Sequence, residues 1–317
     1  MPRILLVKTS SLGDIVHNLP VASDIRAQIP AAEIHWVVEE ALAPIPKLHT
    51  AVQRVIPAAV RRWRNSWWRP ETVSEVQAFV RALRATRYDA VIDTQGLLKS
   101  ALVARAARGT RYGPGWQAWR EPLFMLYDHT FHVQRTQHAV ERNRSLAAQA
   151  LRYIAAARVD YGISAARASC PWLTYRHYAV LIHATSARGK LWSEERWIAV
   201  GKDLAARGMS AVLPWGSTAE HDRSLRLAAS IPEAVVPPAL DLSEVASVLS
   251  GARCAIGVDT GLTHLAGALG TATVGIYRST DPAGTGLYGC ARGLNLGGGL
   301  ASPTADEVLQ AVERLSS

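Results

Sequence analysis

Residues 3–16 read RILLVKTSSLGDIV. A short apolar run that is closed by a polar turn and followed by new apolar spacing is typical of a buried parallel strand leading into a helix. The stretch therefore predicts a strand over Ile4–Lys8 and a helix over Ile15–Gln28. A strand, a turn and a helix in this order are the first half of a βαβ unit, which indicates an α/β fold.

The same alternation continues along the chain. The first half adds strands at Ile34–Val38 and Ala90–Thr94 and a helix at Val73–Ala85. A stretch from about Arg111 to Thr136, rich in Gly, Pro and Trp, breaks the rhythm, and a helix rich in Arg and Ala follows it. The rhythm then restarts with four strands and four helices: Tyr178–His183, Ser193–Arg207, Ser210–Pro214, Thr218–Ser230, Leu242–Ser250, Ala252–Val258, Thr260–Leu269 and Ala272–Tyr277.

This pattern predicts two Rossmann-like α/β domains, 1–160 and 161–317, that face each other across a cleft. The length of 317 residues agrees with two domains. A composition of 49% hydrophobic and 19% charged residues excludes a wholly disordered chain.

The charge balance predicts an anionic partner. Lys and Arg number 35 against 26 Asp and Glu, a formal net charge of +9. Such an excess attracts nucleic acid, phosphorylated small molecules or an acidic membrane surface. The net charge alone does not choose among these three classes.

The cysteines and the apolar runs bear on location. Cys170, Cys254 and Cys290 are widely spaced and form no metal-finger motif, which favours a reducing cytoplasm over a disulfide framework. The apolar run at the N-terminus is too short for a signal peptide. The longest charge-free stretch, 260–277, contains His, Gly and Thr, so we expect no segment that spans a membrane.

Ligands of parallel α/β sheets bind at the carboxyl ends of the strands, and three turns at such positions stand out. The first, 8–14, is neither a dinucleotide-binding glycine motif nor a P-loop. Its Asp14 has two interpretations that the sequence leaves open. The carboxylate is either an N-cap of the following helix or a catalytic group.

The second turn, 257–264, leads from a strand into a helix whose N-terminus suits a diphosphate. Gly261 allows a ligand to come close to the backbone. Asp259 is also interpretable as a cap, and His264 as a histidine packed on the helix face. The third turn, 183–192, offers Thr185, Ser186 and Lys190 to phosphate oxygens, although an exposed polar loop has the same composition.

The sequence has no H-E-x-x-H, G-x-S-x-G or Asp-x-Asp motif, so zinc hydrolysis, serine-hydrolase chemistry and metal-bridged diphosphate binding are not indicated. A transfer reaction without a metal must balance the charge of its leaving group with protein charges and dipoles.

Several of these segments together resemble a known family, the bacterial lipopolysaccharide heptosyltransferases, which are metal-independent inverting glycosyltransferases of the GT-B fold that use ADP-heptose. The resemblance runs along almost the whole chain and is closer to type I than to type II. The matching segments are VKTSSLGD at 7–14, WVVEE at 36–40, RRWR at 61–64, YDAVIDTQGL at 88–97 and VDTGLTHL at 258–265.

The resemblance implies transfer of the first inner-core heptose from ADP-L-glycero-β-D-manno-heptose to Kdo2–lipid A, without a cofactor or a metal. Asp14 is then the general base, and Lys190 offsets the charge on the departing ADP. The second domain binds the donor through Thr185, Ser186, Lys190, Glu220, Leu240, Asp259, Thr260, Gly261 and His264. The first domain binds the acceptor through Ser10, Ser11, Gly13, Arg61, Arg62, Arg64 and Arg120.

Some residues in this assignment have a second interpretation. Glu220 is also a suitable first-turn acid for its helix, and surface arginines are often only solvated charge. The sequence departs from the family pattern at Ser186, where Thr is common, and at 277–279, where Gly often follows the aromatic residue.

Tryptophans interleave with the arginines of the first domain, at 63, 67, 68, 116 and 119. Aromatic and basic side chains together suit a surface that meets lipid headgroups and sugars. We therefore expect a cytoplasmic protein in transient contact with the cytoplasmic face of the inner membrane.

Two alternatives remain. Within the same class, the chain is a type II heptosyltransferase or another GT-B enzyme that uses a nucleotide sugar. In a different class, it is a basic nucleic-acid-binding protein without catalysis. The second alternative predicts one contiguous basic face, whereas the arginines are spread through both halves and no nucleic-acid-binding motif is present. Nucleic acid is therefore not an expected partner.

Overall fold

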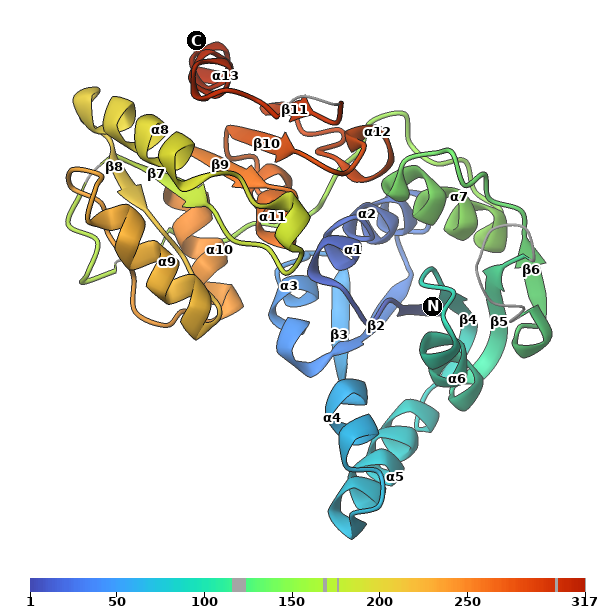
Figure 1. Cartoon of the computed structure of the whole chain (residues 1–317). Helices are drawn as coiled ribbons and strands as arrows, with labels where there is room; N and C mark the ends of the chain where they lie inside the picture. Colours follow the sequence, from blue (N-terminus) through green and yellow to red (C-terminus); the bar gives the residue numbers. More distant parts are fainter. Residues whose placement is uncertain (116–123, 168–169, 176, 300–301, 317) are drawn as a thin grey trace. The chain divides into compact units, whose positions relative to one another are not determined.

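The computed structural model describes residues 1–115, 124–167, 170–175, 177–299 and 302–316. The chain divides into two compact units, Met1–Ile163 and Ser164–Ser317 (Figure 1). Each unit is built around one parallel sheet.

The sheet of the first unit has six parallel strands in the order β3-β2-β1-β4-β5-β6. This is the strand order of a dinucleotide-binding Rossmann fold. The order reverses between β1 and β4, which are neighbours, so a crevice is expected at their carboxyl ends. The strands are β1 (Arg3–Val7), β2 (Glu33–Glu39), β3 (Val52–Ala58), β4 (Arg87–Asp93), β5 (Arg108–Pro114) and β6 (His129–Phe131).

Helices cover both faces of this sheet, because four consecutive residues of β1, which point to opposite faces in turn, are all buried. Leu5 and Val7 share a core with Leu83 of α5 (Pro70–Arg84) and Ala101 of α6 (Leu98–Ala106). On the other face, α2 packs against α7 (Figure 1). The remaining helices are α1 (Leu12–Val16), α2 (Leu19–Gln28), α3 (Pro44–Lys47), α4 (Val60–Asn65), α7 (Ala139–Leu151) and the 3-10 turns η1 (Glu40–Leu42) and η3 (Phe124–Leu126).

The prediction of one helix over Ile15–Gln28 is wrong. The structure has α1 from Leu12 and a separate α2 from Leu19. Pro20 explains the break, because proline has no N–H to donate and its ring clashes with the carbonyl four residues earlier, here Val16. α1 is therefore a helix of only five residues that directly follows the turn after β1.

The stretch from Arg111 to Thr136, which broke the predicted rhythm, also contains regular structure. β5 ends within it and β6 follows at His129–Phe131. β6 has only three residues and no buried ones, so it lacks the apolar run by which a sequence pattern reveals a strand. The predicted helix after this stretch is confirmed as α7.

The sheet of the second unit has five parallel strands in the order β11-β10-β9-β7-β8. Counted within the unit, this is the 2-1-3-4-5 order of flavodoxin-like sheets, whose order reverses between the first and third strands. Those strands are β7 and β9. The strands are β7 (Tyr178–Ile182), β8 (Ser210–Val212), β9 (Cys254–Val258), β10 (Thr273–Tyr277) and β11 (Gly293–Gly297).

The helices of the second unit again lie on both faces of the sheet (Figure 1). α8 and α13 pack against each other over one face, where Trp197 and Val308 join the core, and α10 packs against α11 on the other. The helices are α8 (Glu194–Ala206), α9 (Thr218–Ala228), α10 (Leu242–Gly251), α11 (Gly261–Ala268), α12 (Pro282–Thr285), α13 (Ala305–Ser316) and the 3-10 turn η4 (Arg188–Lys190).

One glycine of the second sheet is required by a close contact. A Cβ on Gly257 of β9 would lie 2.1 Å from Thr263 Oγ1, whose hydroxyl donates to the carbonyl of Val258 over 2.6 Å. The contact ties the first turn of α11 to the end of β9. It thereby fixes the backbone of the turn that carries Asp259.

The predicted α/β class is confirmed in both units. The strands predicted in the second half are all present within one or two residues. Among the described residues, no helix is long and apolar enough to cross a membrane.

Candidate active site

The turns singled out from the sequence lie where the strand order reverses. In the first unit, 8–11 follows β1, and 94–97, a turn that was not singled out, follows its neighbour β4. In the second unit, 183–190 follows β7 and 259–260 follows its neighbour β9. Because all strands are parallel, each pair of turns lies at the same edge of its sheet.

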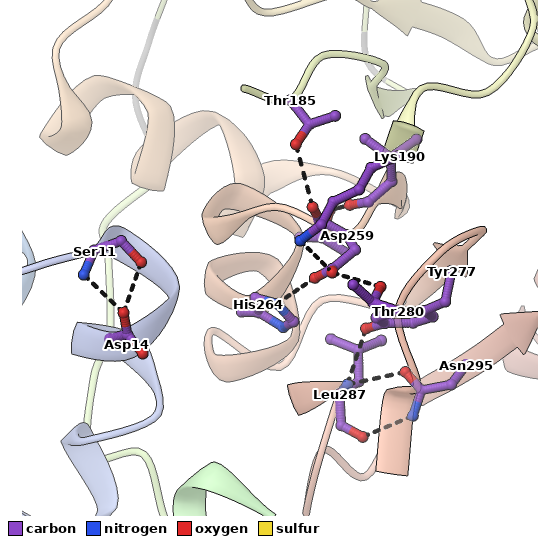
Figure 2. A network of polar contacts seen from close by, with 12 residues as sticks. Ser11, Asp14, Thr185, Lys190, Asp259, His264, Tyr277, Thr280, Leu287 and Asn295 are labelled. Carbon is purple, nitrogen blue, oxygen red and sulfur yellow. Dashed lines mark hydrogen bonds and ion pairs between the residues drawn. The ribbon is translucent and has the colours of Figure 1, made fainter. Parts of the chain in front are cut away.

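Asp14 is an exposed carboxylate at the start of α1. Its Oδ2 accepts hydrogen bonds from the backbone N–H and the side-chain hydroxyl of Ser11, both over 2.8 Å (Figure 2). Ser11 is the N-cap and Asp14 is the third residue of the helix, so Asp14 is not the N-cap itself. Its carboxylate nevertheless completes a capping box with Ser11, so the capping interpretation holds in part. One carboxylate oxygen is engaged in this way, which leaves Oδ1 available to accept a proton.

Cationic side chains surround Asp14 within electrostatic range. Lys8 is buried, and its Nζ donates to the carbonyl of Thr94 over 2.9 Å. Burial lowers the pKa of Lys8, and the charges of Asp14 and Asp93 oppose this effect. Asp14 also acts on Lys99 and Arg142, whose pKa values are both lowered, chiefly by burial. Asp14 therefore lies close enough to three cationic side chains to act on their charges.

Two of the predicted acceptor residues lie in the same turn. Ser10 is buried and its hydroxyl accepts a hydrogen bond from Lys99 Nζ over 2.5 Å, whereas Ser11 is exposed. Gly13 lies between Ser11 and Asp14 in the first turn of α1. Ser10, Ser11, Gly13 and Asp14 thus belong to one turn, and their roles at the acceptor stay predictions.

In the second unit, Asp259 is the centre of a polar network (Figure 2). Its Oδ2 accepts from Lys190 Nζ and from Thr280 Oγ1, both over 2.7 Å. Its Oδ1 lies 3.3 Å from His264 Nε2. Burial alone would raise the pKa of Asp259, but the hydrogen bonds from His264, Lys190 and Thr280 outweigh it and hold this pKa well below the usual range. Asp259 is therefore a fixed anion.

This network bears on the simpler interpretations of two residues. The N-cap of α11 is Thr260, so Asp259 is not a helix cap. His264 is buried on α11 and is paired with Asp259, which agrees with its interpretation as a packed histidine with a hydrogen-bond partner. Lys190 remains 28% exposed while Asp259 is 6% exposed, so the ammonium group stands between the buried carboxylate and solvent.

The remaining residues of these turns lie beside the network. Thr185 is half-buried, and its hydroxyl donates to the carbonyl of Asp259 over 3.4 Å. Ser186 is exposed. Thr260 and Gly261 begin α11, where the first N–H groups of a helix have no partner within it.

Glu220 and Leu240 lie elsewhere in the second unit. Glu220 is half-buried in the first turn of α9, where its Oε2 accepts from the N–H of Gly216 over 2.8 Å. This contact supports its interpretation as a helix-terminal acid. Leu240 is half-buried just before α10.

The predicted acceptor arginines lie on α4 of the first unit. Arg61 and Arg64 are exposed. The guanidinium of Arg62 already forms ion pairs within the unit, with Glu40 over 3.2 Å and with Glu75 over 2.7 Å. Arg120, together with the tryptophans at 116 and 119, lies outside the described residues.

Two further residues of the site were missed in the sequence. Thr280 follows β10 and donates to Asp259, and Gln95 follows β4 and accepts from Thr9. Both come just after a strand, so a systematic reading of the carboxyl ends would have found them. Among the described residues, no group of three or more His, Cys, Asp or Glu side chains is placed to hold a metal ion.

Comparisons with known proteins agree with this geometry. The profile of glycosyltransferase family 9 (heptosyltransferase) matches residues 76–306. The lipopolysaccharide heptosyltransferase 1 of Escherichia coli K12 is 45% identical over 290 residues, which cover 90% of this chain and 91% of that protein.

Solved structures match along the whole chain. The E. coli heptosyltransferase WaaC with ADP is 43% identical, covers 99% of both chains and has a TM-score of 0.89. The same enzyme with ADP-2-deoxy-2-fluoro heptose is 41% identical, covers 98% of this chain and 99% of that one, and has a TM-score of 0.86. These neighbours are GT-B glycosyltransferases, which confirms the predicted fold. Together, the profile match and the identity over nine-tenths of the chain show that the protein belongs to glycosyltransferase family 9, the heptosyltransferases.

Proposed function

We propose that this enzyme transfers L-glycero-D-manno-heptose from ADP-L-glycero-β-D-manno-heptose to a Kdo residue of Kdo2–lipid A. The reaction adds the first heptose of the lipopolysaccharide inner core. Relatives that are 45% identical bear the name lipopolysaccharide heptosyltransferase 1, and the similar solved enzyme holds ADP or an ADP-heptose analogue. The observation that carries the proposal is the Lys190–Asp259 ion pair at the carboxyl edge of the second sheet.

The donor binds at the β7/β9 crevice in this proposal. An ammonium group has three N–H donors, and Lys190 gives one of them to Asp259, so two remain for diphosphate oxygens. The N-terminus of α11 at Thr260 and Gly261 adds backbone N–H groups and a partial positive charge. Thr185 and Ser186 add hydroxyls to the same diphosphate, and Glu220 and Leu240 border the ribose and adenine.

The reaction is inverting and needs no metal. Asp14 takes the proton of the attacking acceptor hydroxyl while that oxygen bonds to the anomeric carbon, and the bond to ADP breaks on the opposite face. The charge that develops on the departing diphosphate is balanced by Lys190 and by the N–H groups of α11. Asp259 is held by three donors and serves as an anchor for Lys190 instead of a base.

The α4–α5 region is proposed to bind the acceptor and to contact the cytoplasmic face of the inner membrane. Arg61 and Arg64 pair with its carboxylates and phosphates, while Arg62 holds α4 to Glu75 of α5. Trp67 and Trp68 are 71% and 63% exposed, and tryptophan is enriched at the membrane–water interface. α4 and α5 extend away from the sheet of their own unit (Figure 1).

A vesicle-binding assay tests the membrane contact. The vesicles contain phosphatidylglycerol and phosphatidylethanolamine and are used at low salt. The wild type is expected to float with the lipid, and the double variant Trp67→Ser/Trp68→Ser is expected to lose most of this binding. Leu225→Ser is the matched control, since Leu225 is 49% exposed but lies in the second unit. Equal flotation of all three proteins would contradict the proposed contact.

The function itself is tested by ADP release from ADP-heptose with heptose-free Kdo2–lipid A in the presence of EDTA. The wild type is expected to release ADP. Asp14→Ala is expected to lose about three orders of magnitude in kcat, in the range of a general base, and to keep its affinity for ADP. Release only with an already heptosylated core would indicate the type II reaction instead. An Asp14→Ala variant as active as the wild type would refute the assignment of the base.

A further inference from the structure

We propose that Gln95 is a positioning residue that holds the Asp14 turn in its reactive geometry. The inference rests on the proposed function, because it concerns the turn that carries the proposed base. Gln95 is 4% exposed, and its Oε1 accepts two hydrogen bonds, from the backbone N–H and from the hydroxyl of Thr9, both over 2.7 Å. A buried side chain that satisfies a turn of another strand in this way restricts where that turn lies.

The backbone that carries the Gln95 side chain is itself held by the buried Asp93. Oδ1 of the buried Asp93 accepts from the backbone N–H of Gln95 over 2.8 Å and from that of Gly96 over 3.0 Å. Tyr127 donates its hydroxyl to the other oxygen of Asp93 over 2.8 Å. Gly96 has a φ of 63°, a conformation that glycine adopts without strain. The turn after β4 is therefore rigid enough to serve as an anchor.

The anchor acts on Asp14 through a short path. Val7 at the end of β1 pairs with Asp93 at the end of β4, so the two turns start side by side. Thr9 lies two residues before Ser11, and Ser11 holds the Asp14 carboxylate through two hydrogen bonds of 2.8 Å. α1 has only five residues. A displaced Thr9 would therefore carry Ser11 and the carboxylate with it.

Small displacements of this kind matter for a general base. The base must come within about 2.6–3.2 Å of the proton it removes, and a misplacement of about 1 Å can cost about 100-fold in rate. Without its acceptor, the N–H of Thr9 would also be left unsatisfied in a buried position, which drives the turn to rearrange. The donor crevice lies in the other unit and does not involve Gln95, so donor binding is expected to stay unchanged.

The test compares Gln95→Met, which keeps the length of the side chain but removes the acceptor, with Tyr88→Phe. Tyr88 lies at the other end of β4 and shares a buried hydrogen bond of 3.0 Å with His35. Tyr88→Phe therefore also removes a buried hydrogen bond from β4, but away from the Asp14 turn. Gln95→Met is expected to lower kcat about 30- to 100-fold with the Kd for ADP within twofold of wild type. Tyr88→Phe is expected to stay within threefold in kcat.

A double-variant cycle with Asp14→Ala separates positioning from general damage. If Gln95 acts through Asp14, the double variant Asp14→Ala/Gln95→Met is no slower than Asp14→Ala alone, because the two losses share one cause. Thr9→Val is expected to lower kcat by removing one of the two donors, and Thr9→Ser to restore it. If Gln95→Met does not fold, these two Thr9 variants test the same hydrogen bond instead.

Three results would overturn the inference. They are wild-type activity in Gln95→Met, an equal loss in Tyr88→Phe, and losses of Gln95→Met and Asp14→Ala that multiply in the double variant. If Asp14→Ala is itself fully active, the proposed base is wrong. If Asp14→Ala is inactive and the losses multiply, only the role of Gln95 is wrong.

Discussion

Replacing Lys190 with methionine removes the partly exposed cation that pairs with the buried Asp259. Methionine keeps a similar length and apolar stem but cannot donate a hydrogen bond. The expected result is a loss of activity much larger than the loss of stability, because Lys190 is proposed to act on charge that develops in the transition state.

The size of each effect follows from the structure. A unit charge about 4 Å from the ammonium group interacts with it by about 4 kcal/mol at the effective dielectric of a protein surface. Lys190 is 28% exposed, which reduces this value, so we expect a loss of about 3 kcal/mol, or roughly 100- to 200-fold in kcat. Asp259 keeps Thr280 and His264 as partners, so folding should lose only about 1 kcal/mol, or about 2–4 °C in Tm.

The assay is steady-state ADP release at saturating ADP-heptose and Kdo2–lipid A, with calorimetry for ADP binding and for Tm. Lys190→Arg keeps the positive charge and is the matched control, with an expected loss below that of Lys190→Met. A Lys190→Met variant that retains more than a third of the wild-type kcat would refute the electrostatic role. A fall of more than 10 °C in Tm would show that the ion pair is mainly structural.

Three further predictions concern the second unit. Burial lowers the pKa of His183 to about 4. Below pH 6.5 the unfolded chain therefore binds a proton that the folded chain does not, and stability should fall by about 3 kcal/mol from pH 6.5 to 4; His183→Gln should flatten this pH dependence in urea titrations. Thr280→Val removes one donor from Asp259 and should weaken ADP binding about fivefold by calorimetry. Gly257→Ala should cost about 1–3 kcal/mol in thermal unfolding because its Cβ would overlap Thr263 Oγ1, and adding Thr263→Ala should restore part of this loss; unchanged stability would contradict the proposed contact.

The sequence pattern predicted the regular part of the fold well, since buried parallel strands and amphipathic helices have distinct apolar periods. It failed where an element lacks that signal. The three-residue β6 has no buried residue, and the break between α1 and α2 depends on one proline. The edge strand β3, with only Ile56 and Ala58 buried, was missed for the same reason.

The site was predictable in its turns but not in its contacts. Strand ends mark where ligands bind, and this rule located Asp14, Lys190 and Asp259. Hydrogen-bond partners that come from distant strands cannot be derived from spacing. Thr280 lies 21 residues after Asp259, and Gln95 lies 86 residues after Thr9, so only the folded sheet brings each pair together.

In both units, one side chain links the turns after two neighbouring strands, but this side chain is neutral in the first unit and charged in the second. If the edge strand β3 is set aside, β1 and β4 correspond to β7 and β9 in strand order. In each unit a side chain from the turn after the second strand grips the turn after the first: Gln95 holds Thr9, and Asp259 holds Lys190. The first clasp is a neutral amide and the second is a charged pair. The neutral amide adds no net charge beside the proposed base, whereas the carboxylate keeps an ammonium group oriented before any phosphate binds. The proposed base and the proposed phosphate site therefore differ in the charge of the side chain that holds each turn in place.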